Sequence, residues 1–245
     1  MKNYFFVLIF ISCFCNSYAQ TNEFIPPKWR LNLSGGLGYL IAGTTADENA
    51  MINLGFDEQK VKKLYNDFKN GIQGSADLHY FLNENIGLGM KYAFFTTNGS
   101  MKQTVGNSNL TLGIKETDNI HFVGPSLQFW SFIGDSWWAY SLTVSGGYAY
   151  LKGNSELSAY NNVNFDLLQA QAEGDTFGIF GGIGLEYWLN DRIALGLDMG
   201  CFLLIFNKLK VKTDLKNNQA LEDSVNNESN NYSRLDFSLS LKIYF

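Results

Sequence analysis

Large apolar residues occupy every second position over the last eleven residues of the chain. They are Leu235, Phe237, Leu239, Leu241, Ile243 and Phe245. The residues between them are Asp236, Ser238, Ser240, Lys242 and Tyr244. A period of two places alternate side chains on opposite faces of a strand. The pattern therefore predicts a terminal strand with one apolar face and one largely polar face.

The same alternation predicts seven earlier strands, so the chain contains eight in all. They span about 29–41, 72–82, 86–97, 120–133, 138–151, 177–189 and 193–206. Each is long enough to cross a bilayer, since a tilted transmembrane strand needs roughly 9–11 residues. By contrast, the chain after the N-terminal segment has no apolar run of the roughly 18 residues that indicate a membrane helix.

The connections between these strands alternate in length. Tight turns are predicted at 83–85, 134–136 and 190–191, where Asn, Asp, Gly and Ser favour reversal of the chain. Long polar stretches lie between them, at about 43–71, 98–119, 152–175 and 207–231. This rhythm predicts an antiparallel up-and-down barrel with short periplasmic turns and long extracellular loops. Both termini then lie at the periplasmic end.

The composition of the polar face indicates that the apolar face meets lipid. A soluble eight-stranded barrel, such as a lipocalin, would instead bury its apolar face and wet a face rich in Lys and Glu. Here the polar face is mostly Gly, Ser, Ala and Thr, which leaves interior room for a few charged or imidazole side chains. These are Arg30, Asp77, His79, Lys91, Glu186, Asp198, Arg234, Asp236 and Lys242.

Because these nine side chains include both signs of charge, they can satisfy one another away from water. We expect them to form a structural network that plugs the lumen. Arg30 and Arg234 lie on the first and last strands, which are neighbours in a closed barrel. Both are expected to share acidic partners among Asp77, Glu186, Asp198 and Asp236.

The chain resembles the small bacterial outer-membrane β-barrel family typified by the OmpA transmembrane domain and OmpX. The resemblance rests on the strand number, the alternating loops, Tyr80-Phe81-Leu82-Asn83 before a tight turn, and the terminal Phe245. It implies location in the bacterial outer membrane and contact with outer-membrane lipid and lipopolysaccharide. It also implies that Phe245 is an assembly signal for the barrel assembly machinery.

The N-terminus has the features of a secretory signal peptide. Lys2 supplies a positive charge, residues 4–11 are apolar, and Ser17-Tyr18-Ala19 offers small residues for cleavage. We therefore predict a signal peptide over 1–19 and a barrel domain over 20–245. Phe10-Ile11-Ser12-Cys13 is a poor lipoprotein signal because Phe stands where Leu is usual. Cleavage leaves Cys201 alone, which excludes an intramolecular disulfide.

Charge argues against a nucleic-acid partner. The net charge is −5 and becomes −6 when Lys2 is removed with the signal peptide. Nucleic-acid binding requires a basic surface. No spacing of Cys and His predicts a metal site, and no phosphate-binding loop is present. The sequence therefore predicts no cofactor.

One segment departs from the period of two. Val61, Leu64, Tyr65 and Phe68 follow the spacing of a helix, with Asp57 placed to cap its start. We predict one amphipathic helix in the first outer loop. It is expected to pack its apolar stripe on the barrel rim as a lid. The alternative is that its lysines contact anionic lipid headgroups or a partner.

Catalysis has little support in the sequence. The histidines are His79 and His121, and a lipid A deacylase would require a Ser two residues after such a His. Those positions are Phe81 and Val123. Glu173, Asp175 and His121 could meet at the outer rim. We expect no enzyme but a structural or surface-interaction barrel, with a narrow passive channel as the alternative and a lipid A-modifying enzyme as a lesser one.

Overall fold

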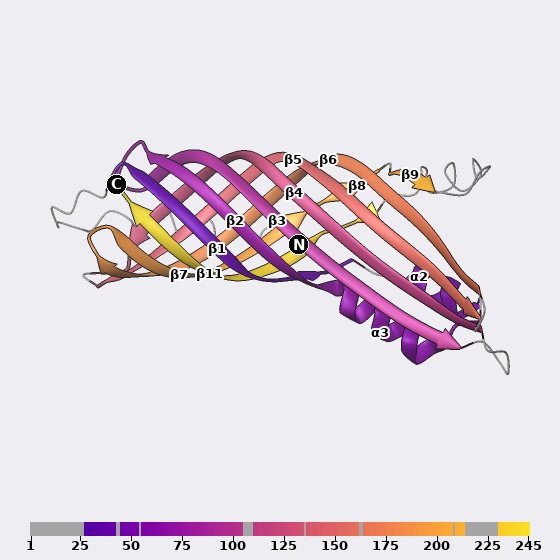
Figure 1. Ribbon diagram of the computed structural model, residues 1–245. Helices are drawn as coiled ribbons and strands as arrows, with labels where there is room; N and C mark the ends of the chain where they lie inside the picture. The colour runs from indigo at the N-terminus through magenta and orange to yellow at the C-terminus, as the bar shows by residue number, and fades with distance from the viewer. Residues whose placement is uncertain are drawn as a thin grey trace, which may run out of the picture.

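The computed structural model describes residues 27–42, 45–53, 55–104, 110–134, 136–161, 164–207, 209–213 and 230–245 (Figure 1). The predicted signal peptide, 1–19, lies outside the described residues and stays a prediction. Among the described residues, no helix is long and apolar enough to cross a membrane.

The described chain consists of strands with two short helices between the first and second strands. The elements are β1 (Trp29–Leu40), α2 (Thr45–Asn53), α3 (Glu58–Lys69), β2 (Asn70–Phe81), β3 (Ile86–Thr104), β4 (Leu110–Phe132), β5 (Trp138–Asn161), β6 (Asn164–Asn190), β7 (Ile193–Leu203), β8 (Ile205–Phe206), β9 (Lys210–Thr213), β10 (Asn230–Asn231) and β11 (Arg234–Tyr244).

Eight of these strands close into a ring. Each strand from β1 to β6 pairs antiparallel with the next, and β11 pairs with both β7 and β1. The closing seam runs from Arg30 opposite Tyr244 to Leu40 opposite Arg234. The predicted eight-stranded antiparallel up-and-down barrel is confirmed. Closure gives every ring strand two partners, and a membrane-spanning sheet needs this because lipid cannot satisfy a free edge.

The predicted assignment of the two faces is also confirmed. Large apolar side chains cover the outside of the barrel, with 68% of Leu37 and 70% of Leu239 exposed. The alternating polar side chains point inward and are buried, Arg30, Glu186 and Lys242 among them. This arrangement is the inverse of a soluble barrel, so the lipocalin alternative is excluded.

Two of the predicted outer loops are wrong, because β3, β4, β5 and β6 continue through them. Within the stretch predicted as a loop at 98–119, residues 98–104 of β3 pair with residues 111–117 of β4. Within the stretch at 152–175, residues 152–161 of β5 pair with residues 164–173 of β6. We call this part of β3–β6 the extension; it projects past the rest of the ring (Figure 1). Its outward face meets water, so the apolar alternation stops although the strands do not.

The predicted amphipathic helix is confirmed as α3. Asp57 caps it by accepting a hydrogen bond from the backbone N–H of Lys60 at 3.0 Å. Its buried residues, Val61, Leu64 and Tyr65, pack with Met101 on the extension. The helix therefore lies along the inner face of β3 (Figure 1). A second helix, α2, was not predicted, because residues 45–53 lack an amphipathic pattern.

Candidate functional site in the barrel interior

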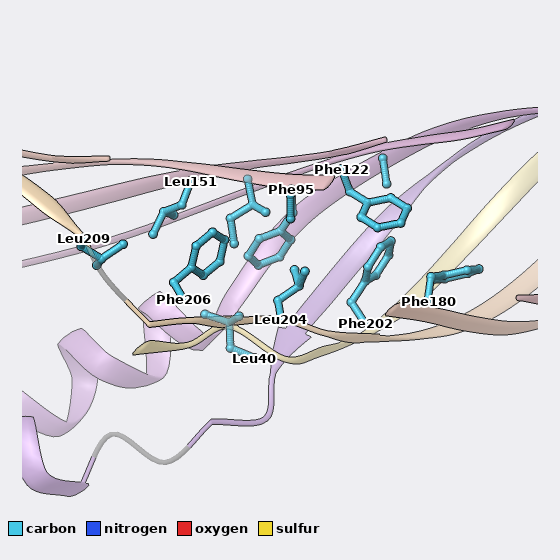
Figure 2. Close-up of a cluster of buried hydrophobic side chains, with 12 residues drawn as sticks. Leu40, Phe95, Phe122, Leu151, Phe180, Phe202, Leu204, Phe206 and Leu209 are labelled. Carbon is cyan, nitrogen blue, oxygen red and sulfur yellow. The ribbon is translucent and has the colours of Figure 1, made fainter. Parts of the chain in front are cut away.

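The barrel interior is divided into three layers along its axis. The inner aromatic cluster lies at the short-turn end and consists of Phe81, Trp130, Phe132, Ala139, Trp188, Ala194 and Tyr244. The charged layer follows, with the cations Arg30, Lys91, Arg234 and Lys242 and the carboxylates Asp77, Glu186, Asp198 and Asp236. The outer apolar cluster comes next and consists of Leu40, Ala93, Phe95, Ile120, Phe122, Ala149, Leu151, Phe180, Phe202, Leu204, Phe206 and Leu209 (Figure 2).

Glu186 on β6 is the centre of the charged layer. Its Oε1 accepts hydrogen bonds from Arg30 Nη2 at 2.6 Å and from Lys242 Nζ at 3.1 Å. Its Oε2 accepts from Tyr244 Oη at 2.6 Å and from Trp130 Nε1 at 3.2 Å. Four donors from three strands, β1, β4 and β11, therefore satisfy one fully buried carboxylate. Two of them come from the inner aromatic cluster, which joins that cluster to the charged layer.

The remaining charges form smaller groups around this centre. Lys242 Nζ also donates to Asp198 Oδ1 at 2.8 Å. Asp77 accepts hydrogen bonds from Lys91 Nζ and from Asn32 Nδ2, each at 2.9 Å. Asp198 is the one carboxylate of the layer that is not fully buried, with 21% of its side chain exposed. Four cations thus face four carboxylates, so the layer is neutral overall.

The partner predicted for Arg234 is only partly right. Its Nε donates to Asp236 at 3.0 Å, whereas Arg30 pairs with Glu186, so the ion pairs of the described residues do not join the two arginines through one carboxylate. The Arg234 guanidinium instead lies over the rings of Phe95 and Phe202, 4.6 Å and 4.1 Å from their centroids. This cation–π arrangement places Arg234 where the charged layer meets the outer apolar cluster.

His79 is an interior hydrogen-bonding residue. Its Nε2 lies 2.6 Å from Ser126 Oγ, and only 1% of His79 and 4% of Ser126 are exposed. The pair has the spacing of a nucleophile and a base. Both side chains are buried in the lumen, away from the outer surface of the barrel. The geometry fits a structural contact between β2 and β4.

Interior glycines make room for the large side chains of neighbouring strands. A Cβ on Gly200 would lie 2.4 Å from the Phe180 ring, and a Cβ on Gly182 would lie 2.6 Å from the same ring. Phe180 therefore lies flat against the wall, where its ring also receives Lys91 Nζ at 4.2 Å. The glycines on the inward face therefore provide the space that bulky inward side chains such as Phe180 need.

A small polar cavity lies in the charged layer. Its volume is about 40 Å³, and Arg30, Asn32, Asp77, Gln128 and Asp198 contribute to its lining. Phe180 and Phe202 border it on the side of the outer apolar cluster. The cavity thus lies within the charged layer, against the outer apolar cluster.

The sequence interpretation missed the outer apolar cluster. Its signal is a local loss of alternation, because Phe202, Leu203, Leu204, Ile205 and Phe206 are apolar in succession. Leu203 and Ile205 face outward, while the other three are buried inside. Phe122 and Phe202 meet at 5.2 Å between ring centroids and face one another in Figure 2.

The outer-rim group that the sequence leaves open is only partly assembled. His121 faces outward and its Nδ1 lies 2.9 Å from Tyr92 Oη. It stands in a row across the strands, opposite Phe94 on β3 and Tyr150 on β5, and Tyr150 stands opposite Asp175. Glu173 and Asp175 line a surface hollow of about 430 Å³ with Tyr150, Asn207 and Lys210, without His121. No group of His, Cys, Asp and Glu in the described ranges could hold a metal ion.

Asp118 is a buried carboxyl beyond the apolar band that the sequence did not single out. It lies on β4 five residues past Val123, near the last lipid-facing apolar side chains of that strand, and only 7% of it is exposed. Tyr232 Oη donates a hydrogen bond to its Oδ2 at 2.5 Å. Burial raises the pKa of Asp118 to about 6, although the hydrogen bond from Tyr232 opposes this shift.

Phe245 lies on the closing seam. Its backbone N–H donates to Trp29 O, and Trp29 N–H donates to Phe245 O, both at 2.9 Å. Its side chain is 60% exposed on the lipid face. The position agrees with a role at the end of the closing strand, and its role as an assembly signal stays a prediction.

Comparison with known proteins identifies similar folds only. No protein-family model and no curated protein sequence matches the chain. A major outer membrane protein from Thermus thermophilus is 9% identical, with 89% of this chain and 99% of that chain covered at a TM-score of 0.40. Neisserial surface protein A is 10% identical, covering 89% and 97% at 0.39. Ail, the attachment invasion locus protein of Yersinia pestis, is 12% identical, covering 90% and 99% at 0.36.

These structures are small outer-membrane β-barrels, and the similarity to them concerns the fold alone. The membrane assignment of this chain rests on its own geometry. It has a closed antiparallel ring, an apolar outer band and a polar interior whose charges are paired. The chain is therefore an integral membrane β-barrel.

Proposed function

We propose that the protein is a non-conducting outer-membrane barrel that holds its extension outside the cell as a binding or adhesion surface. The observation that carries the proposal is the continuation of β3–β6 past the rest of the ring as an ordered sheet. A polar segment that served only to connect strands would not need a ladder from Leu110 opposite Asn161 down to the membrane.

The packing of α3 supports the same role. The helix packs on Met101 of β3 through Val61, Leu64 and Tyr65. Gln103 Nε2 also donates a hydrogen bond to the backbone oxygen of Gly55, just before the helix, at 3.1 Å. The extension is thus preformed rather than ordered on binding, which lowers the entropic cost of recognition. Outer-membrane lipid and lipopolysaccharide contact the apolar band in this proposal, and the assembly machinery acts on β11.

The surface role is tested by removing the extension and keeping the ring. In the shortened variant, tight turns join β3 to β4 after Thr97 and before Asp118, and β5 to β6 after Gly153 and before Ala172. Cells producing the full chain should adhere to one another or to immobilised matrix proteins, and cells producing the shortened chain should not. Equal adherence of the two, with both folded by heat-modifiable gel mobility, would refute the proposal.

The alternative of a narrow passive channel has one observation in its favour, the polar cavity in the charged layer. The clusters on both sides of that layer oppose it, because bulky aromatic and aliphatic side chains fill the lumen there. Steady conductance of the refolded, unmutated protein in a planar bilayer would favour the channel. Mass spectrometry of lipid A from producing cells tests the lesser alternative, a lipid A-modifying enzyme.

A further inference from the structure

Several buried polar atoms around the cavity have no partner among the described protein groups. They include the donors Arg30 Nε and Nη1 and the acceptors Asn32 Oδ1, Gln128 Oε1 and Asp198 Oδ2. All four residues line the cavity. Buried polar groups are usually hydrogen-bonded, and leaving one unsatisfied costs about 1–3 kcal/mol. The site therefore calls for an occupant that both donates and accepts hydrogen bonds.

The charge of the surrounding layer selects a neutral occupant. Each cation in the layer already lies within 3.1 Å of a carboxylate oxygen, so four positive and four negative charges are paired. An added anion or cation would give the layer a net charge. A cavity of about 40 Å³ holds about three waters at 10–15 Å³ each. Water fits the volume, the charge and the mixture of free donors and acceptors.

The layers on either side have the opposite character. The inner aromatic cluster stacks Trp188 on Tyr244, with ring centroids 4.3 Å apart, and Trp130 lies 5.8 Å from Trp188. In the outer apolar cluster the centroid of the Phe202 ring lies 4.7 Å from that of Phe180, in a tilted pair, and 5.2 Å from that of Phe122, in an edge-to-face pair. An eight-stranded barrel is just wide enough to be filled by side chains. Such apolar constrictions stop ions by excluding water.

We propose that the charged layer is a sealed, water-holding chamber, and that the apolar clusters above and below it close the lumen. In this arrangement the paired charges keep the chamber neutral and bind its water, but they do not form the barrier to ions. This differs from the plug of interior charges expected from the sequence, because it assigns closure to uncharged side chains. It also goes beyond the proposed surface role, which does not depend on how the lumen is closed.

Conductance of refolded variants in planar bilayers separates the two kinds of closure. The cluster variant carries Phe122→Ala and Phe202→Ala in the outer apolar cluster and Phe81→Ala and Trp188→Ala in the inner one. It should raise conductance roughly tenfold or more over the unmutated protein. The charge variant carries Glu186→Gln and Lys242→Met and should stay as closed as the unmutated protein. Leu197→Ala removes apolar volume on the lipid face, where 59% of Leu197 is exposed, and is the matched control.

Conductance in the charge variant with a closed cluster variant would overturn the proposal, as would steady conductance of the unmutated protein. A second measurement applies if the cluster variant does not fold. A high-resolution crystal structure of the unmutated protein should contain ordered waters bonded to Arg30 Nε and Gln128 Oε1, with none among the outer phenylalanines. A dry chamber, or a chain of waters through the outer apolar cluster, would refute it.

Discussion

The strands β3–β6 carry different outward-facing residues within the lipid band and in the extension. Within the lipid band, the outward positions of β3 and β4 carry Met90, Tyr92 and Leu127. In the extension, the outward positions carry Lys102 and Lys115, although the ladder between the strands is continuous. The surrounding solvent, rather than the strand itself, therefore determines the sequence alternation.

Ion pairs differ between the two regions in the same way. Arg30, Lys242 and Glu186 are all buried, whereas the Lys115–Glu156 pair in the extension is 3.8 Å long with side chains 61% and 41% exposed. Bulk water can replace a lost partner in the extension, whereas the buried pairs of the lumen have no access to bulk water. Loss of one partner should thus be costly in the lumen and nearly silent in the extension.

The largest effect is expected for Glu186→Ala. It leaves Arg30 and Lys242 facing one another without their shared carboxylate, which should lower the free energy of unfolding by roughly 3–5 kcal/mol. Urea unfolding in bilayers measures this. Glu156→Ala in the extension is the matched control. Similar losses for the two variants would break the distinction between lumen and extension.

Substitutions on the outer surface should show the next largest effect. Leu239→Arg places a charge in the apolar band, where 70% of Leu239 is exposed, and should cost roughly 2–4 kcal/mol. Ser240→Asn, on the neighbouring inward position, should cost less. Tyr160→Arg makes the same polar change on the extension and should be close to neutral. A costly Tyr160→Arg would place the extension in lipid.

The pH dependence of Asp118 gives a third test at the boundary between the regions. Its pKa is raised from 3.8 to about 6 by burial, so the native state favours the protonated form. The resulting stability is fully present below about pH 4 and is lost as pH rises through 6, by at most about 3 kcal/mol. Asp118→Asn should remove this dependence in urea titrations between pH 4 and 7.5. An unchanged slope would show that another group titrates.

The smallest effect is expected for the Lys115–Glu156 pair. A double-mutant cycle with Lys115→Ala and Glu156→Ala should give a coupling of roughly 0.2–1 kcal/mol that falls with added salt. A coupling as large as that between Lys242 and Glu186 would mean that the extension is shielded from water.

The sequence predicts the fold well where strands touch lipid. The predicted bounds of β1, β2, β7 and β11 lie within a few residues of those observed, because each alternates between lipid and lumen. The outer halves of β3–β6 were missed because water meets one of their faces and α3 or open space meets the other. Residues such as Thr117 and Asn119 then carry no periodic signal.

In the barrel interior, the sequence pattern predicts which residues face inward, but the strand register determines which of them pair. The identity of the charged residues follows from their position on the inward face. Their partners depend on the stagger of distant strands, which brings Glu186 of β6 to Arg30 of β1. The outer apolar cluster was missed since residues such as Phe95 and Phe180 stand singly on a face otherwise occupied by small residues.

The seam between Trp29 and Phe245 has a consequence for the timing of assembly. These residues belong to the first and last strands of the ring in sequence, yet they exchange two backbone hydrogen bonds. A growing chain therefore carries two open sheet edges, which can pair with other molecules, until its final strand arrives. The chain stays vulnerable to misassembly until β11, the last strand to be synthesised, pairs with β1, the first.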